Sequence, residues 1–279
     1  MTLQVEELRN LIEHLRAQWL EHGLPAQKWV QPAARKGKHV EDFDVARIAT
    51  VKGLVRHVHE TATAVALLAD HGHVNAMPPL VRQMYECALT AVWLMQSEDD
   101  HGIKAVIAEH APNRAAIQKD ARRASSPVFR DGAEKVADTD VRPFADTFDS
   151  VRNFEGVCND LTAEETDAYI VYRRLSTYSH AALEVVDLYF ERTVPQRGYA
   201  PLSEHVPSEA LGLQSLLHIA ASSIVWSARA FTYSAESVPY RSALRMAAKE
   251  LEISAEVSLS DTYRRRHATK RRERRTSSS

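Results

Sequence analysis

The sequence predicts an all-α fold, a multi-helix bundle, and three observations support this prediction. Glycine is scarce, with 9 residues among 279, and aromatic residues make up 7% of the chain. Ala, Leu, Glu and Arg are plentiful, and all four favour helix. Runs in which Val, Ile and Thr alternate with polar residues, as they do in strands, are few. A hydrophobic content of 44% is enough for one main domain with a sizeable core.

Apolar residues recur at helical spacing along most of the chain, so the helices can be placed in order. Pro78 and Pro79 open the third helix, because proline is tolerated in a first turn. The fourth helix is expected to break at Pro112, since proline removes a backbone donor. The predicted helices span residues 3–22, 44–72, 78–95, 99–124, 162–192, 208–234 and 239–253.

Two further segments are assigned from local signals. Residues 125–150, which include Pro143, are predicted as a long excursion with short helical pieces, because prolines and scattered charges interrupt any periodicity. The sequence Thr-Ala-Glu-Glu beginning at Thr162 matches a capping box, with Glu165 three residues on. Thr162 is therefore expected to cap a helix that runs to about Arg192, and Thr162→Ala to destabilise the fold by about 1 kcal/mol.

Charge is distributed unevenly along the chain. Residues 264–275 hold eight basic residues and one Glu, a local charge of +7, so the overall charge of −2 leaves −9 for the rest. This segment has no apolar face, which predicts a disordered basic tail over residues 259–279. The remaining boundaries place an N-terminal helix and linker at 1–43 and the bundle domain at 44–258.

The basic tail predicts binding to nucleic acid through phosphate contacts. Two alternatives stay open: the charge run is a solvated terminus, or it folds back onto the acidic body. Deleting residues 264–279 is expected to leave stability almost unchanged. The nucleic-acid contacts predicted from the tail are Arg264, Arg265, Arg266, Lys270, Arg271, Arg272, Arg274 and Arg275.

The sequence also indicates a compartment and excludes several kinds of site. Two lone cysteines, Cys87 and Cys158, favour a reducing compartment, and the acidic N-terminus does not resemble a signal peptide. No apolar run reaches membrane-spanning length. A cytoplasmic protein without a membrane partner is expected. The sequence contains no His-Glu-x-x-His, no P-loop and no Gly-x-Gly-x-x-Gly, so neither a metal nor a cofactor is predicted.

A polar stripe on the helix predicted over residues 162–192 carries the most chemistry. Helical spacing puts Arg173, Ser176, Thr177, His180 and Glu184 on one face, with Arg174 about a third of a turn away. A cation and a titratable base can cleave a phosphodiester without metal, because RNA supplies its own 2′-hydroxyl nucleophile. The alternative is an ordinary half-buried helix face whose histidine caps a neighbouring loop.

A second polar pair lies on an earlier, strongly apolar helix. Arg82 and Glu86 are one helical turn apart, and a buried carboxylate needs a partner. Either Glu86 faces the helix of Arg173 and His180 and orients one of them, or it pairs locally with Arg82. Both alternatives are compatible with the sequence.

These two motifs resemble those of a known group of proteins. They are Arg82-x-x-x-Glu86 and Tyr172-Arg173-x-Leu175-Ser176-x-x-x-His180. Together they resemble an uncharacterised family of all-helical bacterial proteins that is similar to the HEPN superfamily (higher eukaryotes and prokaryotes nucleotide-binding). The resemblance covers roughly residues 44–235 and implies a HEPN-like helical core. The motif of active HEPN domains is Arg, four to six residues, then His, so both Arg173 and Arg174 fit.

The resemblance implies a metal-independent ribonuclease, a toxin or defence effector, whose sites form across a homodimer. His180 would act as general acid and base, and Arg173 or Arg174 would bind the phosphate. The residues expected to support them are Glu86, Arg82, Ser176 and Tyr172. The alternative function is a non-catalytic helical interaction protein whose basic tail binds nucleic acid or an acidic protein partner of unknown identity.

Overall fold

Helices make up 76% of the residues that the computed structural model describes, which confirms the all-α multi-helix bundle. The structure describes residues 3–25, 41–97, 99–135, 144, 146–162, 167–190, 209–234 and 238–277. Within these residues no helix has the length and apolar character needed to cross a bilayer.

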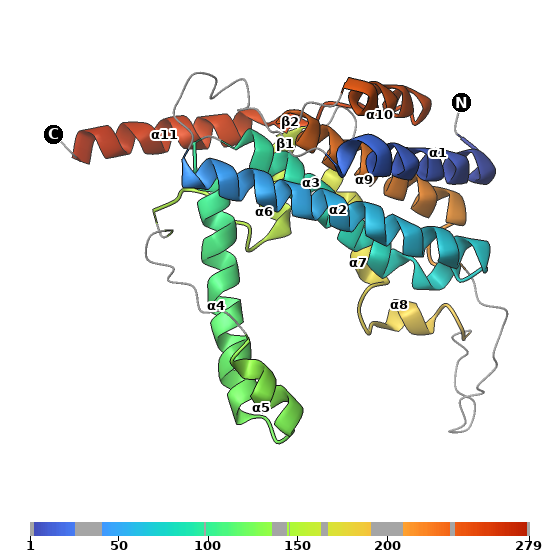
Figure 1. Cartoon of the computed structure of the whole chain (residues 1–279), viewed down its shortest axis with the longest axis horizontal. Coiled ribbons are helices and arrows are strands. Elements are labelled where there is room, and N and C mark those ends of the chain that lie inside the picture. The colour runs from blue at the N-terminus through green and yellow to red at the C-terminus, as the bar shows by residue number, and fades with distance from the viewer. Residues whose placement is uncertain are drawn as a thin grey trace, which may run out of the picture.

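Five helices of the described part of the chain form the body of the bundle (Figure 1). The long helix α2 packs against α3 and α9, which also pack against each other, while α1 and α10 cover α9. A π-helical turn, Trp19–Gly23, continues α1. The five helices are α1 (Val5–Gln18), α2 (Asp42–Asp70), α3 (Pro78–Gln96), α9 (Leu213–Thr232) and α10 (Val238–Glu250).

The remaining elements lie around this body. The α4–α5 pair projects from one end as an arm, and α11 leaves the same end in another direction (Figure 1). Leu161 pairs with Leu259 in a short antiparallel ladder that joins the start of α11 to the segment after α6. A 3₁₀ turn spans Val74–Ala76. The peripheral elements are α4 (His101–Arg123), α5 (Pro127–Ala133), α6 (Phe154–Asn159), β1 (Leu161–Thr162), α7 (Ala168–Thr177), α8 (Leu183–Val186), β2 (Ser258–Leu259) and α11 (Asp261–Ser277).

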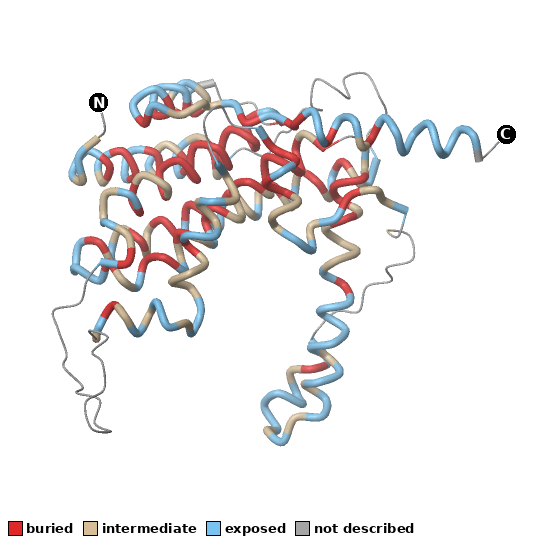
Figure 2. Tube along the Cα trace, turned by 180° about the vertical axis from the view of Figure 1, so that it is seen from behind, coloured by how far each residue is buried: buried red, intermediate tan, exposed pale blue. Residues whose placement is uncertain are grey.

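Burial follows the predicted helical periodicity in the body. On α2, Val51, Val55, Val58 and Val65 are fully buried, at positions three, four and seven residues apart. Figure 2 shows this buried stripe continuing through the centre of the bundle, whereas the outer part of the arm, from Pro112 on, is mostly exposed. Leu8 and other apolar residues of α1 belong to the same core. The N-terminal helix is therefore part of the bundle and not a separate segment.

The core also holds a buried histidine. The ring of His59 stacks on Trp19 with 4.8 Å between ring centroids, and its Nε2 lies 2.8 Å from the hydroxyl of Tyr240. Burial, together with the nearby charge of Arg16, lowers the pKa of His59 from 6.5 to about 3. His59 is thus neutral in the folded protein at every pH at which the bundle is expected to be stable.

The shifted pKa of His59 predicts a pH dependence of stability. Below pH 6.5 the unfolded chain binds a proton at this residue and the folded chain does not. The free energy of unfolding should therefore decrease as the pH is lowered below 6.5. His59→Gln should remove about 1.4 kcal/mol of this loss per pH unit. Urea denaturation of the variant and of wild type at several pH values measures the difference. The exposed neighbour His57→Gln is the control, and equal pH dependence in wild type and His59→Gln would contradict the prediction.

Two predicted helix boundaries are wrong. Helix α4 runs unbroken through Pro112, which lies on its exposed side, so the missing amide donor does not end it. Thr162 lies in β1 opposite Ser258, and α7 begins after Asp167, so Thr162 does not cap that helix. The loss of about 1 kcal/mol expected for a cap therefore does not apply to Thr162→Ala.

Helix α5 is one of the short helical pieces predicted within residues 125–150. Three residues named in the sequence predictions, Pro143, Glu165 and Arg192, lie outside the described residues.

The motif helix is also shorter than predicted. It ends at Thr177, and His180 follows it in a turn, while Glu184 belongs to α8. The hydroxyls of Ser176 and Ser179 donate to backbone carbonyls four residues earlier, each at 2.8 Å. Ser and Thr side chains that bond back in this way weaken the helix, which explains why α7 stops within a Ser-Thr-Tyr-Ser run.

The largest correction concerns the C-terminal segment. Residues predicted as a disordered tail form α11, and Tyr263 and His267 on it are fully buried. The outer part of α11 is exposed and extends beyond the bundle (Figure 2). The alternative that the charge run folds back onto the acidic body, left open from the sequence, holds for the part of α11 that contains Tyr263, Arg266 and His267.

Candidate functional site

Arg82 and His180 meet at the junction of α3 and the turn after α7. Nη1 of Arg82 lies 2.8 Å from Nε2 of His180, although the two residues are 98 positions apart. A guanidinium can only donate hydrogen bonds, so Nε2 accepts. This bond therefore requires a neutral imidazole that carries its hydrogen on Nδ1. A cation and a proton acceptor are in direct contact at an exposed position of the chain.

Two further side chains hold the Arg82 guanidinium in place. Oε1 of Glu86 accepts from Nε at 3.1 Å and from Nη2 at 3.0 Å. Nη2 also donates to the hydroxyl of Tyr172 at 2.9 Å. The two alternatives for Glu86 therefore combine: it pairs locally with Arg82, and through Arg82 it acts on His180. Side-chain exposures of 18% for Arg82 and 32% for Glu86 leave this pair partly accessible.

Packing beneath α7 fixes the position of Tyr172. Leu175 is fully buried and anchors the helix on the bundle. The ring of Tyr172 contacts Phe154 of α6 with 4.7 Å between centroids, and the Arg82 guanidinium lies 5.0 Å from the centre of the same ring. Cation–π contact and a charged hydrogen bond thus act on one arginine. The cluster is built on three helices and does not depend on a loop alone.

The two arginines predicted to bind phosphate lie elsewhere on α7. Arg173 lies 6.0 Å from the centre of the Tyr169 ring, and Arg174 lies 5.2 Å from that of Tyr178. Both side chains are exposed. The hydrogen bond that the structure places on His180 comes from Arg82. One feature of the sequence indicated that Arg82 has a special role, namely its polar pairing with Glu86 on an otherwise apolar helix.

The cluster of Arg82, Glu86, Tyr172 and His180 has the features of an anion site. The Tyr172 oxygen accepts from Arg82, so its own hydrogen can be donated outward. The second hydrogen on Nη1 of Arg82 and the exposed His180 ring lie beside it. Phosphate oxygens are acceptors that suit such a set of donors. Among the described residues, no group of three or more His, Cys, Asp or Glu side chains is arranged to hold a metal ion.

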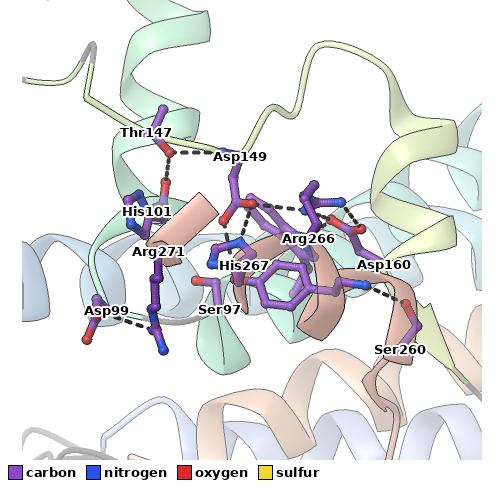
Figure 3. Close-up of polar contacts among 12 residues, drawn as sticks. Ser97, Asp99, His101, Thr147, Asp149, Asp160, Ser260, Arg266, His267 and Arg271 are labelled. Carbon is purple, nitrogen blue, oxygen red and sulfur yellow. Dashed lines mark hydrogen bonds and ion pairs between the residues drawn. The ribbon is translucent and has the colours of Figure 1, made fainter. Parts of the chain in front are cut away.

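The basic residues of α11 divide into two faces. Figure 3 shows Arg266 between Asp160 and Asp149, with His267 on the other side of Asp149. Arg266 binds both oxygens of Asp160 at 2.6 and 2.7 Å and Oδ1 of Asp149 at 3.0 Å. His267 Nε2 lies 2.7 Å from the same Asp149 oxygen. Arg266, one of the predicted nucleic-acid contacts, therefore binds α11 to the body of the bundle instead.

This network also shifts the pKa values of Asp149 and Arg266. Burial alone would raise the pKa of Asp149, but the hydrogen bonds and charges of His267 and Arg266 outweigh it and lower that pKa. Hydrogen bonds to Asp160 and Asp149 raise the pKa of Arg266, against the effect of burial. The Asp149 carboxylate is thus kept ionised inside the structure, where it binds α11.

Other basic residues of α11 also pair with carboxylates. Arg271 contacts Asp99 at 3.3 Å, and Arg274 contacts Asp146. Lys270 pairs with Glu273 at 3.0 Å within the helix, and Arg264 pairs with Asp261 at 3.3 Å. The outward side of the helix carries Arg265 and Arg272, and Arg275, one turn after Arg271, is exposed as well. The predicted set is thus split between structural contacts and an exposed basic ridge.

The fold and the cluster together define an all-helical protein with an arginine–histidine site. Residues 49–197, more than half of the chain, match the family of unknown function DUF5677, and the chain belongs to that family. The matched region contains Arg82, Glu86, Tyr172 and His180 but not α9, α10 or α11. No curated protein and no solved structure matches the chain.

Proposed function

We propose that the chain is a HEPN-like ribonuclease that cleaves RNA without a metal ion, with Arg82 and His180 as its reacting pair. The observation that carries this proposal is the 2.8 Å contact between the Arg82 guanidinium and the neutral His180 ring at an exposed junction. Such cleavage suits a cytoplasmic toxin or defence effector that acts on cellular RNA. Arg82 takes the phosphate-binding role that the sequence assigned to Arg173 or Arg174.

The geometry suggests an order of events. A phosphate oxygen that accepts from Nη1 of Arg82 would displace His180 and free its Nε2. That nitrogen takes the proton of the 2′-hydroxyl as the 2′-oxygen bonds to phosphorus. The bond from phosphorus to the 5′-oxygen then breaks, and the leaving oxygen receives a proton from solvent or from a second copy. Arg82 and Tyr172 would stabilise the charge that builds on the phosphoryl oxygens.

Exposed apolar side chains beside this site favour a homodimer. Ile170, Leu183 and Val186 on α7 and α8 are 63%, 68% and 48% exposed. Apolar side chains gathered on one surface commonly mark a protein interface. A second copy placed there would bring two His180 side chains near one substrate, one as base and one as acid. Light scattering at micromolar concentration tests this, and a monomer would exclude the shared site.

The decisive test is the activity of the purified chain on a panel of single-stranded and structured RNAs. Cleavage is expected to persist in excess chelator and to leave 2′,3′-cyclic phosphate and 5′-hydroxyl ends, because the 2′-hydroxyl is the nucleophile. Substrates with a 2′-deoxy residue at the scissile position should resist cleavage. If no RNA in the panel is cut, or if a chelator stops cleavage, the proposal is wrong.

The exposed ridge of α11 supports a second candidate function. Arg265 and Arg272 lie on the side of the helix that faces away from the body, so a non-catalytic protein that binds nucleic acid or an acidic partner is also consistent with the fold. Nucleic-acid binding by a chain that cleaves no RNA would favour this function.

A further inference from the structure

Two basic elements extend from one end of an acidic body. The base of α4 and α11 are adjacent, since the rings of His101 and His267 are 5.5 Å apart and Arg271 reaches Asp99. From this junction the α4–α5 arm and α11 diverge (Figures 1 and 2). Residues 111–135 of the arm carry six basic and three acidic residues, a charge of +3, and α11 carries +6. The overall −2 therefore leaves −11 for the rest of the chain.

The arm exposes charge and an aromatic ring that its own fold does not use. Lys119 and Arg123 are exposed and one helical turn apart on α4, and within the described residues no ion pair is recorded for either. Phe129 at the tip is 65% exposed, and Val128 beside it is 76% exposed. Arg130 differs, since it donates to the carbonyls of Ala124 and Ser125 at 2.7 Å and so closes the turn.

The outward ridge of α11 is held rigidly by the opposite face of the helix. Because Tyr263 and His267 are fully buried and Arg266 binds two aspartates, the helix cannot rotate to bury its other side. Arg265 and Arg272 are two helical turns apart, roughly 10 Å along the axis. The ridge contains no large apolar residue, which disfavours insertion into a lipid surface.

We infer that the arm and the ridge of α11 together form a binding surface for single-stranded nucleic acid. Phosphates would bind Lys119 and Arg123 on the arm and Arg265 and Arg272 on α11, while an unpaired base stacks on Phe129. An aromatic ring at an exposed tip suits unpaired bases and not a duplex, whose bases are stacked on one another. The surface lies at the end of α3 away from Arg82, which is separated from Gln96 by about 21 Å along the helix.

This inference concerns binding alone, so it can be tested apart from cleavage. Fluorescence anisotropy with a labelled, unstructured RNA and the His180→Ala chain measures affinity at several salt concentrations. Lys119→Gln with Arg123→Gln should weaken binding roughly tenfold at low salt and reduce the salt slope by about 1.4. Arg265→Gln with Arg272→Gln should do the same. Phe129→Ala should weaken binding about tenfold with an unchanged salt slope, because stacking releases no counterions.

The matched control lies on α10, outside the arm and α11. Arg245 and Lys249 are also exposed and one turn apart, so Arg245→Gln with Lys249→Gln removes the same charge from another surface. The affinity of this control variant for the RNA should stay within about twofold of that of the unaltered surface. Equal weakening by the control pair and the arm pair would overturn the proposed surface, as would duplex RNA binding as tightly as the single strand.

Single-stranded DNA of the same sequence shows whether the 2′-hydroxyl contributes. Binding lost in the arm and α11 variants, with no RNA cleaved by the wild-type chain, would sustain this inference and remove the ribonuclease proposal.

Discussion

Arg266→Ala is expected to lower the free energy of unfolding by about 3 kcal/mol, because it removes the guanidinium that binds two buried carboxylates. The side chains of Asp149 and Asp160 are 0% and 6% exposed, whereas that of Arg266 is 35% exposed. Removing one member of a buried ion pair commonly destabilises by about 3–5 kcal/mol, and the partial exposure of Arg266 places it at the lower end. Urea denaturation followed by circular dichroism measures the change.

The adjacent residue provides the control for this prediction. Arg265→Ala removes the same charge from the exposed side of α11 and should change stability by less than about 0.5 kcal/mol. Asp160→Asn in the Arg266→Ala background should recover part of the loss, since it removes one buried charge. Equal effects of Arg265→Ala and Arg266→Ala would show that α11 is not docked. Deleting residues 264–279 should also destabilise the fold, whereas the sequence predicted almost no change in stability.

The body of the bundle could be predicted because apolar periodicity determines it. Helices α2, α3 and α9 each carry apolar residues that recur at helical spacing, and those residues form the core. Local signals were less informative. Thr162 matches a capping box, but in the structure it lies in β1 and pairs with β2, which is almost a hundred residues further along the chain. A single antiparallel contact of this kind leaves no periodic signal.

Helix α11 could not be predicted for a different reason. Its docking depends mainly on polar contacts, with Arg266 and His267 binding aspartates 106 to 118 residues earlier. Hydropathy counts such residues as solvent-exposed, so a segment that is buried through ion pairs is classed as disordered. Composition therefore identified the charge of the segment correctly and its structure wrongly.

The candidate site was predictable in composition but not in pairing. Both motifs, Arg82–Glu86 and Arg173–His180, were visible in the sequence, and Tyr172 was included with them. Helical geometry favoured an arginine on the same helix as His180, because positions on one helix can be compared directly. The contact instead crosses from α3 to the end of α7, where the hydroxyl-rich run stops the helix. Only the tertiary structure brings Arg82 to His180.

Arg82→Gln is expected to reduce RNA cleavage by about 10²–10³-fold, as the loss of a donor to the developing charge does in other enzymes. Arg82→Lys should recover only part of this activity, because an ammonium keeps the charge but not the planar set of donors that also reaches Glu86 and Tyr172. His180→Ala should reduce cleavage by about 10²–10⁴-fold through loss of the proton acceptor. Single-turnover cleavage of one RNA under chelation measures all three rates.

The exposed arginines of α7 make this series discriminating. Arg173→Gln and Arg174→Gln remove the same charge close to His180 in sequence, but their guanidiniums lie over Tyr169 and Tyr178, so each should change the rate by less than about threefold. A large loss in either variant, with Arg82→Gln unaffected, would restore the assignment made from the sequence. Arg82→Gln leaves the Glu86 carboxylate without the guanidinium with which it pairs. The double variant Arg82→Gln with Glu86→Gln therefore separates an effect on catalysis from an effect on folding. It should regain stability but not activity, since only the arginine contacts both His180 and the incoming phosphate.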